Sequence, residues 1–191
     1  VILDHCRRHA IWIFADDAYE RLYYADGQTC APSFLDIAGP EDRVVSTNTF
    51  SKAWLMTGWR LGWLVVPEGL TADLAKLIEY NTSCAPGFVQ RAGIAALEQG
   101  EPVIARTRAR LRAARDFLIG ELNGIPRVQT ALPAGAIYAF LHIDGVTDSL
   151  AFCKQLVRRV GLGLAPGSAF GPEGEGYVRW CFAASRQRLA D

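Results

Sequence analysis

The sequence has almost no net charge, no long apolar run and no leader-like beginning. Its 191 residues carry 20 lysines and arginines against 20 aspartates and glutamates, and the isoelectric point is about 7.0. This balance gives no electrostatic reason to expect nucleic acid or an anionic membrane as a partner. The longest apolar runs, such as residues 61–67, are far shorter than the ~18 residues of a membrane span, and no signal-peptide pattern is present. We therefore expect a cytoplasmic protein without a nucleic-acid or membrane partner.

Paired cysteines, clustered histidines and the commonest catalytic motifs are also missing. No C-x-x-C pair joins the five widely spaced cysteines, which are Cys6, Cys30, Cys84, Cys153 and Cys181. We interpret them as reduced, mostly buried thiols of a cytosolic protein. The three histidines show no metal-ligand spacing, so no metal site is expected. A G-x-S-x-G elbow, a Walker A loop and a G-x-G-x-x-G turn after a strand are all absent, which excludes the usual serine hydrolase and nucleotide-binding signatures.

The length requires an explanation. Half of the residues are hydrophobic, which is typical of a globular core. The chain begins with Val1 and not with methionine, and residues 5–9 (HCRRH) resemble the last turn of a helix already under way. We therefore expect these residues to be a piece of a longer protein.

Strand and helix patterns alternate along the chain with short turns between them. The first part predicts strands at residues 10–15, 43–50 and 60–66 and helices at residues 70–80, 86–98 and 101–122. The second part predicts strands at 128–130, 136–143, 163–165 and 177–182, with a helix at 148–160. This order predicts an α/β fold followed by a small α+β domain. We place the boundary between residues 105 and 106.

Arginines are frequent on the helix expected at residues 101–122. They are Arg106, Arg108, Arg110, Arg112 and Arg115. At about 100° per residue these side chains spread around the helix and form no single stripe. Together with the balanced total charge, this favours a solvated helix face over a nucleic-acid surface.

One lysine lies in an unusual setting. Lys52 follows the strand expected at 43–50, next to the hydroxyls of Thr49 and Ser51, and Arg60 comes eight residues later. A lysine at the carboxyl end of a strand in an α/β sheet projects into the crevice where ligands bind. The hydroxyls and the guanidinium group suit a phosphate.

A carboxylate and a phenol complete this pattern. Asp16 and Tyr19 follow the strand expected at 10–15, with the spacing D-x-x-Y. A carboxylate, a phenol, an amine and a phosphate clamp are together what a pyridoxal 5'-phosphate (PLP) site requires.

Five motifs, in this order and spacing, resemble the class I/II aminotransferases of the fold-type I PLP-dependent superfamily. They are DDAYE at residues 16–20, TFSK at 49–52, TGWRLG at 57–62, PGSAFG at 166–171 and YVR at 177–179. The resemblance covers nearly the whole chain. It implies that residues 1–105 are the carboxyl-terminal part of the large PLP-binding domain, an α/β domain with a mixed, mainly parallel sheet. Residues 106–191 would be the small carboxyl-terminal α+β domain. It also implies the carboxyl-terminal half of an aminotransferase, an enzyme of amino acid metabolism and biosynthesis.

The resemblance also implies a role for each site residue. Lys52 looks like the Schiff-base lysine, and Asp16 looks like the partner of the pyridine nitrogen. Tyr19 looks like the donor to the cofactor's phenolic oxygen. The residues that look like phosphate ligands are Thr49, Ser51 and Arg60. Arg179 looks like the group that binds the substrate α-carboxylate, whereas a protein ion pair is the plainer interpretation of a buried arginine. For the adjacent Asp17, a helix cap or an exposed strand-end acid is expected.

Several parts of the family's site lie upstream of residue 16 in its members, so this chain departs from the complete pattern. Among them is a tyrosine contributed by a partner subunit, and the resemblance therefore implies a homodimer. The expected substrates are an amino acid and a 2-oxo acid. Two alternatives remain open, namely a PLP-dependent carbon-sulfur lyase of the same fold and the aminotransferase-like sensor domain of a transcription regulator.

Overall fold

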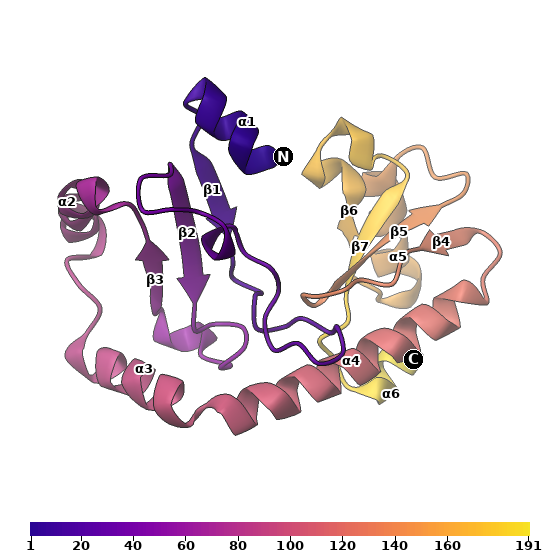
Figure 1. The fold of residues 1–191 in the computed structure, drawn as a ribbon. Coiled ribbons are helices and arrows are strands. Elements are labelled where there is room, and N and C mark those ends of the chain that lie inside the picture. Colours follow the sequence, from indigo (N-terminus) through magenta and orange to yellow (C-terminus); the bar gives the residue numbers. More distant parts are fainter. The chain divides into compact units, whose positions relative to one another are not determined.

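The computed structural model describes all residues from 1 to 191, and the chain divides into two compact units. Unit 1 comprises Val1–Arg108 and unit 2 comprises Ala109–Asp191. The long helix α4 (Glu101–Asn123) contains the division. Figure 1 shows the elements of both units in chain order. No helix combines the length and the apolarity that a membrane-spanning segment needs.

A three-stranded mixed sheet forms the centre of unit 1. Its strands are β1 (Ile13–Asp16), β2 (Val44–Thr49) and β3 (Gly62–Val65), in that order across the sheet. β1 and β2 are parallel, whereas β2 and β3 are antiparallel. The helices of this unit are α1 (Ile2–His9), α2 (Thr71–Thr82), α3 (Gly87–Gln99) and the start of α4, with short 3-10 turns η1 (Phe34–Asp36), η2 (Thr57–Trp59) and η3 (Glu68–Leu70). The predicted mixed sheet is confirmed.

The two faces of this sheet have different surroundings. One face carries Ile13 and Val44, which form a buried cluster with Leu3 of α1. Ser46 and Asn48 of β2 lie on the same face, because alternate residues of a strand share a face, and both are buried. Asp16 and Thr47 are paired on the opposite face. The sheet therefore has one covered face and one face that carries the expected cofactor-binding side chains of β1.

Unit 2 is an antiparallel sheet packed against a helix. The strands are β4 (Val128–Thr130), β5 (Tyr138–Ile143), β6 (Ala165–Pro166) and β7 (Tyr177–Cys181), in the order β4-β5-β7-β6. Helix α5 (Ser149–Val160) packs against β6 and β7. The remaining elements are α6 (Arg186–Ala190) and the 3-10 turns η4 (Gly167–Phe170) and η5 (Pro172–Gly174). Leu141, Val178 and Phe182 are almost completely buried and form part of its core.

Three expectations from the sequence are wrong in detail. The third strand begins at Gly62 and not at residue 60, because Arg60 ends η2 in the left-handed conformation, with φ of 52°. Arg115 is buried and not solvated, because its guanidinium group donates to the carbonyl of Pro133 at 2.7 Å and pairs with Asp116. The cysteines are not mostly buried, since Cys30, Cys84 and Cys181 are exposed and Cys153 alone is fully buried.

Candidate functional site

The carboxyl ends of β1 and β2 carry the first group of predicted site residues. Asp16 ends β1 with an exposed side chain, and its Oδ1 atom accepts a hydrogen bond from the backbone N–H of Ala18 at 3.2 Å. This bond begins the turn that leads to Tyr19. Because β1 and β2 are parallel, their carboxyl ends lie at one edge of the sheet, where ligands bind in folds of this kind.

Lys52 and Tyr19 come together at this edge. The Lys52 Nζ atom lies 5.5 Å from the centre of the Tyr19 ring, so an amine from the end of β2 meets a phenol from the end of β1. Lys52 lies on a turn that is anchored by the next two residues, which are buried. The indole N–H of Trp54 donates to the carbonyl of Ala96 in α3 at 3.0 Å and fixes this turn to the helix.

The hydroxyl groups of Thr49 and Ser51 form a pair just before Lys52. The Thr49 hydroxyl donates to the Ser51 hydroxyl at 2.9 Å, and its oxygen accepts from the Ser51 backbone N–H at 3.0 Å. Ser51 is buried, whereas Thr49 is half-buried. Two clustered hydroxyls beside a lysine are suited to the oxygens of an anion.

The Arg60 side chain is held by the backbone of the turn that precedes it. Its left-handed φ is uncommon for a residue with a side chain, and its Nη1 atom donates to the carbonyl of Thr57 at 3.1 Å. The next-but-one residue, Gly62, permits a close approach of β3 to β2, since an added Cβ would lie 2.4 Å from the Asn48 carbonyl oxygen. This geometry holds the exposed guanidinium group at the start of β3.

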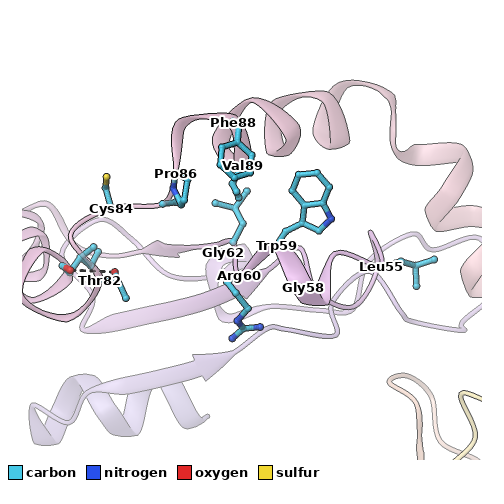
Figure 2. A pocket seen from close by; sticks show the side chains of 13 residues that line it. Leu55, Gly58, Trp59, Arg60, Gly62, Thr82, Cys84, Pro86, Phe88 and Val89 are labelled. Carbon is cyan, nitrogen blue, oxygen red and sulfur yellow. Dashed lines mark hydrogen bonds between the residues drawn. The ribbon is translucent and has the colours of Figure 1, made fainter.

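A pocket of about 930 Å³ lies between η2 and β3 on one side and α2 and α3 on the other. Figure 2 shows that the Arg60 side chain points away from Phe88 and Val89, which line the pocket from α3. Arg60 alone among the predicted site residues contributes to its wall. The wall is largely apolar, and its residues are Leu55, Gly58, Trp59, Arg60, Leu61, Gly62, Ile78, Thr82, Cys84, Ala85, Pro86, Phe88 and Val89. This pocket is therefore distinct from the group formed by Lys52, Tyr19 and the hydroxyl pair.

Unit 2 carries the last predicted site residue, Arg179 of β7. Its guanidinium carbon lies 4.3 Å from the centre of the Tyr138 ring and 4.5 Å from the centre of the Phe170 ring. No carboxylate of residues 1–191 lies within 4.0 Å of its nitrogen atoms, so these residues supply no acidic partner for it. A half-buried cation between two aromatic rings, without an acidic partner, is suited to an anionic ligand.

The structure brings some of the predicted residues into contact and leaves others apart. Lys52 meets Tyr19, and Thr49 meets Ser51. The side chains of Asp16 and Arg60 bond to neighbouring backbone groups. Arg179 belongs to the other unit.

Two features of the site escaped the sequence analysis. The first is the pair of aromatic rings beside Arg179, which belong to Tyr138 and Phe170. Phe170 lies in the PGSAFG motif, but no function was predicted for it. The sequence does contain a signal for Tyr138, because its strand alternates aromatic side chains with apolar ones and so places the aromatic ones on one face. The second is Asp17, which is neither exposed nor a simple helix cap, since its carboxylate accepts hydrogen bonds from Ser33 and Ser46.

An acidic side chain near Asp17 has a shifted pKa. Burial raises the pKa of the Glu20 carboxyl group above its ordinary value, and the negative charges of Asp17 and Asp36 raise it further. The positive charge of Arg21 opposes this shift. The loop after β1 therefore carries a concentration of negative charge.

The whole chain is similar to known proteins. Residues 1–190 match the family described as "Aminotransferase class I and II". The putative aminotransferase YugH of Bacillus subtilis is 33% identical over 100% of this chain and 48% of its own length. An aspartate aminotransferase of Pyrococcus horikoshii is 33% identical, again over 100% of this chain and 48% of its own length.

Solved structures show the same relationship. The crystal structure of an aspartate aminotransferase from Thermotoga maritima has a TM-score of 0.88 and 32% identity, over 99% of this chain and 48% of that one. An aromatic aminotransferase from Pyrococcus horikoshii has a TM-score of 0.89 and 31% identity, over 98% of this chain and 50% of that one. The chain thus spans about half the length of the relatives that it matches.

The mixed sheet and the smaller α+β unit that follows it in the chain match about half of these aminotransferase structures, so the chain has part of a PLP-dependent transferase fold. The chain belongs to the class I and II aminotransferase family, whose members depend on PLP. The α/β fold class predicted from the sequence is confirmed by the same match.

Proposed function

We propose that the protein is a PLP-dependent aminotransferase that moves an amino group between an amino acid and a 2-oxo acid. The observation that carries this proposal is the contact between Lys52 and Tyr19 in a chain of this family. Two hydroxyl groups, those of Thr49 and Ser51, lie just before Lys52 in the sequence. A purely structural role does not require this combination of an amine, a phenol and two hydroxyls.

The chemical groups present fit the cofactor. Thr49, Ser51 and Arg60 offer hydroxyl and guanidinium donors for its phosphate, and Asp16 offers an exposed carboxylate for its ring nitrogen. When bound, PLP supplies an aldehyde carbon that forms a Schiff base with amines and a pyridine ring that accepts electrons.

Each of these side chains would then have a defined task. Lys52 would hold the cofactor covalently between turnovers and move a proton at the substrate Cα. Asp16 would keep the ring nitrogen protonated. Tyr19 would donate a hydrogen bond to the cofactor's phenolic oxygen. These tasks require an amine, a carboxylate and a phenol, which are the groups found at this edge of the sheet.

Arg179 would bind the substrate α-carboxylate. Its guanidinium group has no acidic partner in unit 2, and a carboxylate can accept two parallel hydrogen bonds from it. An amino acid and a 2-oxo acid both carry this carboxylate, so a single arginine serves both substrates of the exchange.

The organisation of the whole protein is part of the same proposal. We assign residues 1–105 to the large PLP-binding domain and residues 106–191 to the small domain, and we propose a homodimer. The support is family membership together with the division of the chain between Arg108 and Ala109. Sedimentation of the purified full-length protein tests the assembly, and a monomer at micromolar concentration would contradict it.

A coupled assay tests the activity. The purified full-length protein is incubated with PLP, an amino acid and a 2-oxo acid acceptor, and we expect a new 2-oxo acid that appears only when the acceptor is present. Pyruvate and ammonia formed without the acceptor would instead favour the carbon-sulfur lyase. Cofactor binding without any turnover would favour the sensor domain.

The lysine has its own test. Lys52→Ala should abolish the visible absorbance that PLP acquires on binding and should abolish turnover, because the covalent attachment is lost. Lys76→Ala is the matched control, since Lys76 is an exposed residue of α2 that pairs with Asp73. A Lys52→Ala protein with the wild-type spectrum would overturn the assignment.

A further inference from the structure

A chain of buried and half-buried polar groups lies behind the carboxyl edge of the sheet. The Asp17 Oδ2 atom accepts a hydrogen bond from the Ser46 hydroxyl at 2.6 Å and another from the Ser33 hydroxyl at 3.0 Å. Ser46 is completely buried, and its oxygen also accepts from the Asn48 side-chain amide at 2.9 Å. The short distance to Ser46 is typical of a charge-assisted hydrogen bond to a carboxylate.

These bonds connect three separate segments of the chain. Asp17 follows β1, Ser46 belongs to β2, and Ser33 begins η1 in the loop between the two strands. The Asp17 backbone N–H also donates to the Thr47 carbonyl at 3.0 Å, so the hydrogen bonds between β1 and β2 continue one residue past the end of β1. Ser33 is itself fixed, because its backbone N–H donates to the Asp36 carboxylate at 2.8 Å.

The position of Asp17 determines where its neighbour points. Successive side chains of a strand alternate between the two faces of the sheet. With Asp17 held on the covered face beside Ser46, Asp16 is directed to the opposite face, where it is exposed. Rotation of this strand end would break the two hydroxyl bonds and leave a half-buried carboxylate without donors, which is unfavourable.

We propose that Asp17 is a positioning residue that holds Asp16 in the direction required to meet the cofactor's ring nitrogen. The role rests on the proposed function, since it matters only if Asp16 has that partner. Because its carboxylate lies on the covered face beside Ser46, Asp17 would not touch the cofactor. It acts through the turn that connects Asp16 to Tyr19, and Ser33 and Ser46 share its role.

Cofactor spectroscopy separates this role from a purely structural one. Asp17→Ala should weaken PLP binding by about tenfold, as expected for the loss of a buried hydrogen-bonding partner. It should also shift the pH midpoint of the visible absorbance of bound PLP, because Asp16 would no longer be held towards the ring nitrogen. Asp73→Ala, which removes an exposed acid of α2, is the control and should change neither quantity.

Two further variants keep the test valid if Asp17→Ala does not fold. Asp17→Asn retains the shape and an acceptor oxygen, so it should fold and show a smaller change in the same direction. The double variant Ser33→Ala with Ser46→Ala leaves the charge of Asp17 in place but removes both donors, and it should reproduce the spectral shift. Wild-type dissociation constants and spectra in a folded Asp17→Asn and in the double variant would overturn the inference.

The spectrum of the unmodified full-length protein separates failure of the proposed function from failure of the role of Asp17. Absence of a visible band with PLP, or a band that survives Lys52→Ala, would overturn the proposed function and this inference with it. A normal band that depends on Lys52 but not on Asp17, Ser33 or Ser46 would overturn the inference alone.

Discussion

At the scale of single residues, the environment of Arg179 is the most informative feature. An arginine that is half-buried in a strand ordinarily has an acidic partner, because an unpaired buried charge is unfavourable. Here the partners are the faces of two aromatic rings, at 4.3 and 4.5 Å from the guanidinium carbon. The rings restrict the orientation of the guanidinium group and leave its N–H groups available to a ligand.

This environment predicts the effect of removing one ring. Phe170→Ala should raise the KM for both the amino acid and the 2-oxo acid by about tenfold, with a smaller change in kcat, because a cation–π contact in a partly desolvated site is lost. Steady-state kinetics with each substrate varied in turn measures the effect. Phe170→Tyr retains the ring and serves as the control. An unchanged KM in a folded Phe170→Ala protein would contradict the role of the ring.

At the scale of secondary-structure elements, the close approach of β2 and β3 depends on one glycine. Gly62 pairs with Thr49, and an added Cβ would lie 2.4 Å from the Asn48 carbonyl oxygen, which is far too close. The backbone on both sides would have to move. Because Thr49 belongs to the hydroxyl pair beside Lys52, this movement would also reach the candidate site.

A substitution tests this packing. Gly62→Ala should lower the free energy of unfolding by roughly 1–3 kcal/mol, which is the usual cost of overpacking. Gly58→Ala is the matched control, since an added Cβ there would meet nothing within 4 Å. Urea denaturation of the three proteins gives the comparison. Equal midpoints for Gly62→Ala and Gly58→Ala would show that β3 can move away without loss of stability.

At the scale of the whole molecule, one ion pair connects the amino-terminal helix to the strand that carries the site. Arg7 of α1 donates to both carboxylate oxygens of Asp42, at 2.7 and 2.6 Å, just before β2 begins. The Asp42 carboxylate also accepts from the Gly39 backbone N–H at 2.7 Å. The hydrogen bond from Arg7 is the largest cause that lowers the pKa of Asp42 from 3.8 to about 2.

This shift predicts a definite dependence of stability on pH. Because the folded-state pKa is below the unfolded value, the pair stabilises the protein above pH 3.8, and this contribution is lost as the pH falls through about 2. NMR titration of the Asp42 carboxyl group should give a midpoint near 2 in the wild type. Arg7→Gln should raise that midpoint and reduce the loss of stability between these two pH values. A wild-type midpoint near 3.8 would contradict the ion pair.

Much of the fold could be predicted from local patterns. The helices expected at residues 86–98 and 101–122 are present as α3 and α4, because the spacing of apolar residues on a helix is a local property. The strand expected at 43–50 is present as β2, where β-branched residues are frequent. Arg60 departs from its strand pattern, because it caps the 3-10 turn η2 in the left-handed conformation, which the apolar pattern of residues 60–66 does not indicate.

The sequence by itself determined the family to which the chain belongs and the residues that carry the amine, phenol, hydroxyl and guanidinium groups, since these depend on residue type and order. The tertiary structure alone decided the contact of Lys52 with Tyr19, the aromatic partners of Arg179 and the attachment of Asp17 to Ser46. The physical reason is that each of these contacts joins residues from different segments of the chain. Their meeting depends on strand pairing and on which face of a sheet a side chain occupies.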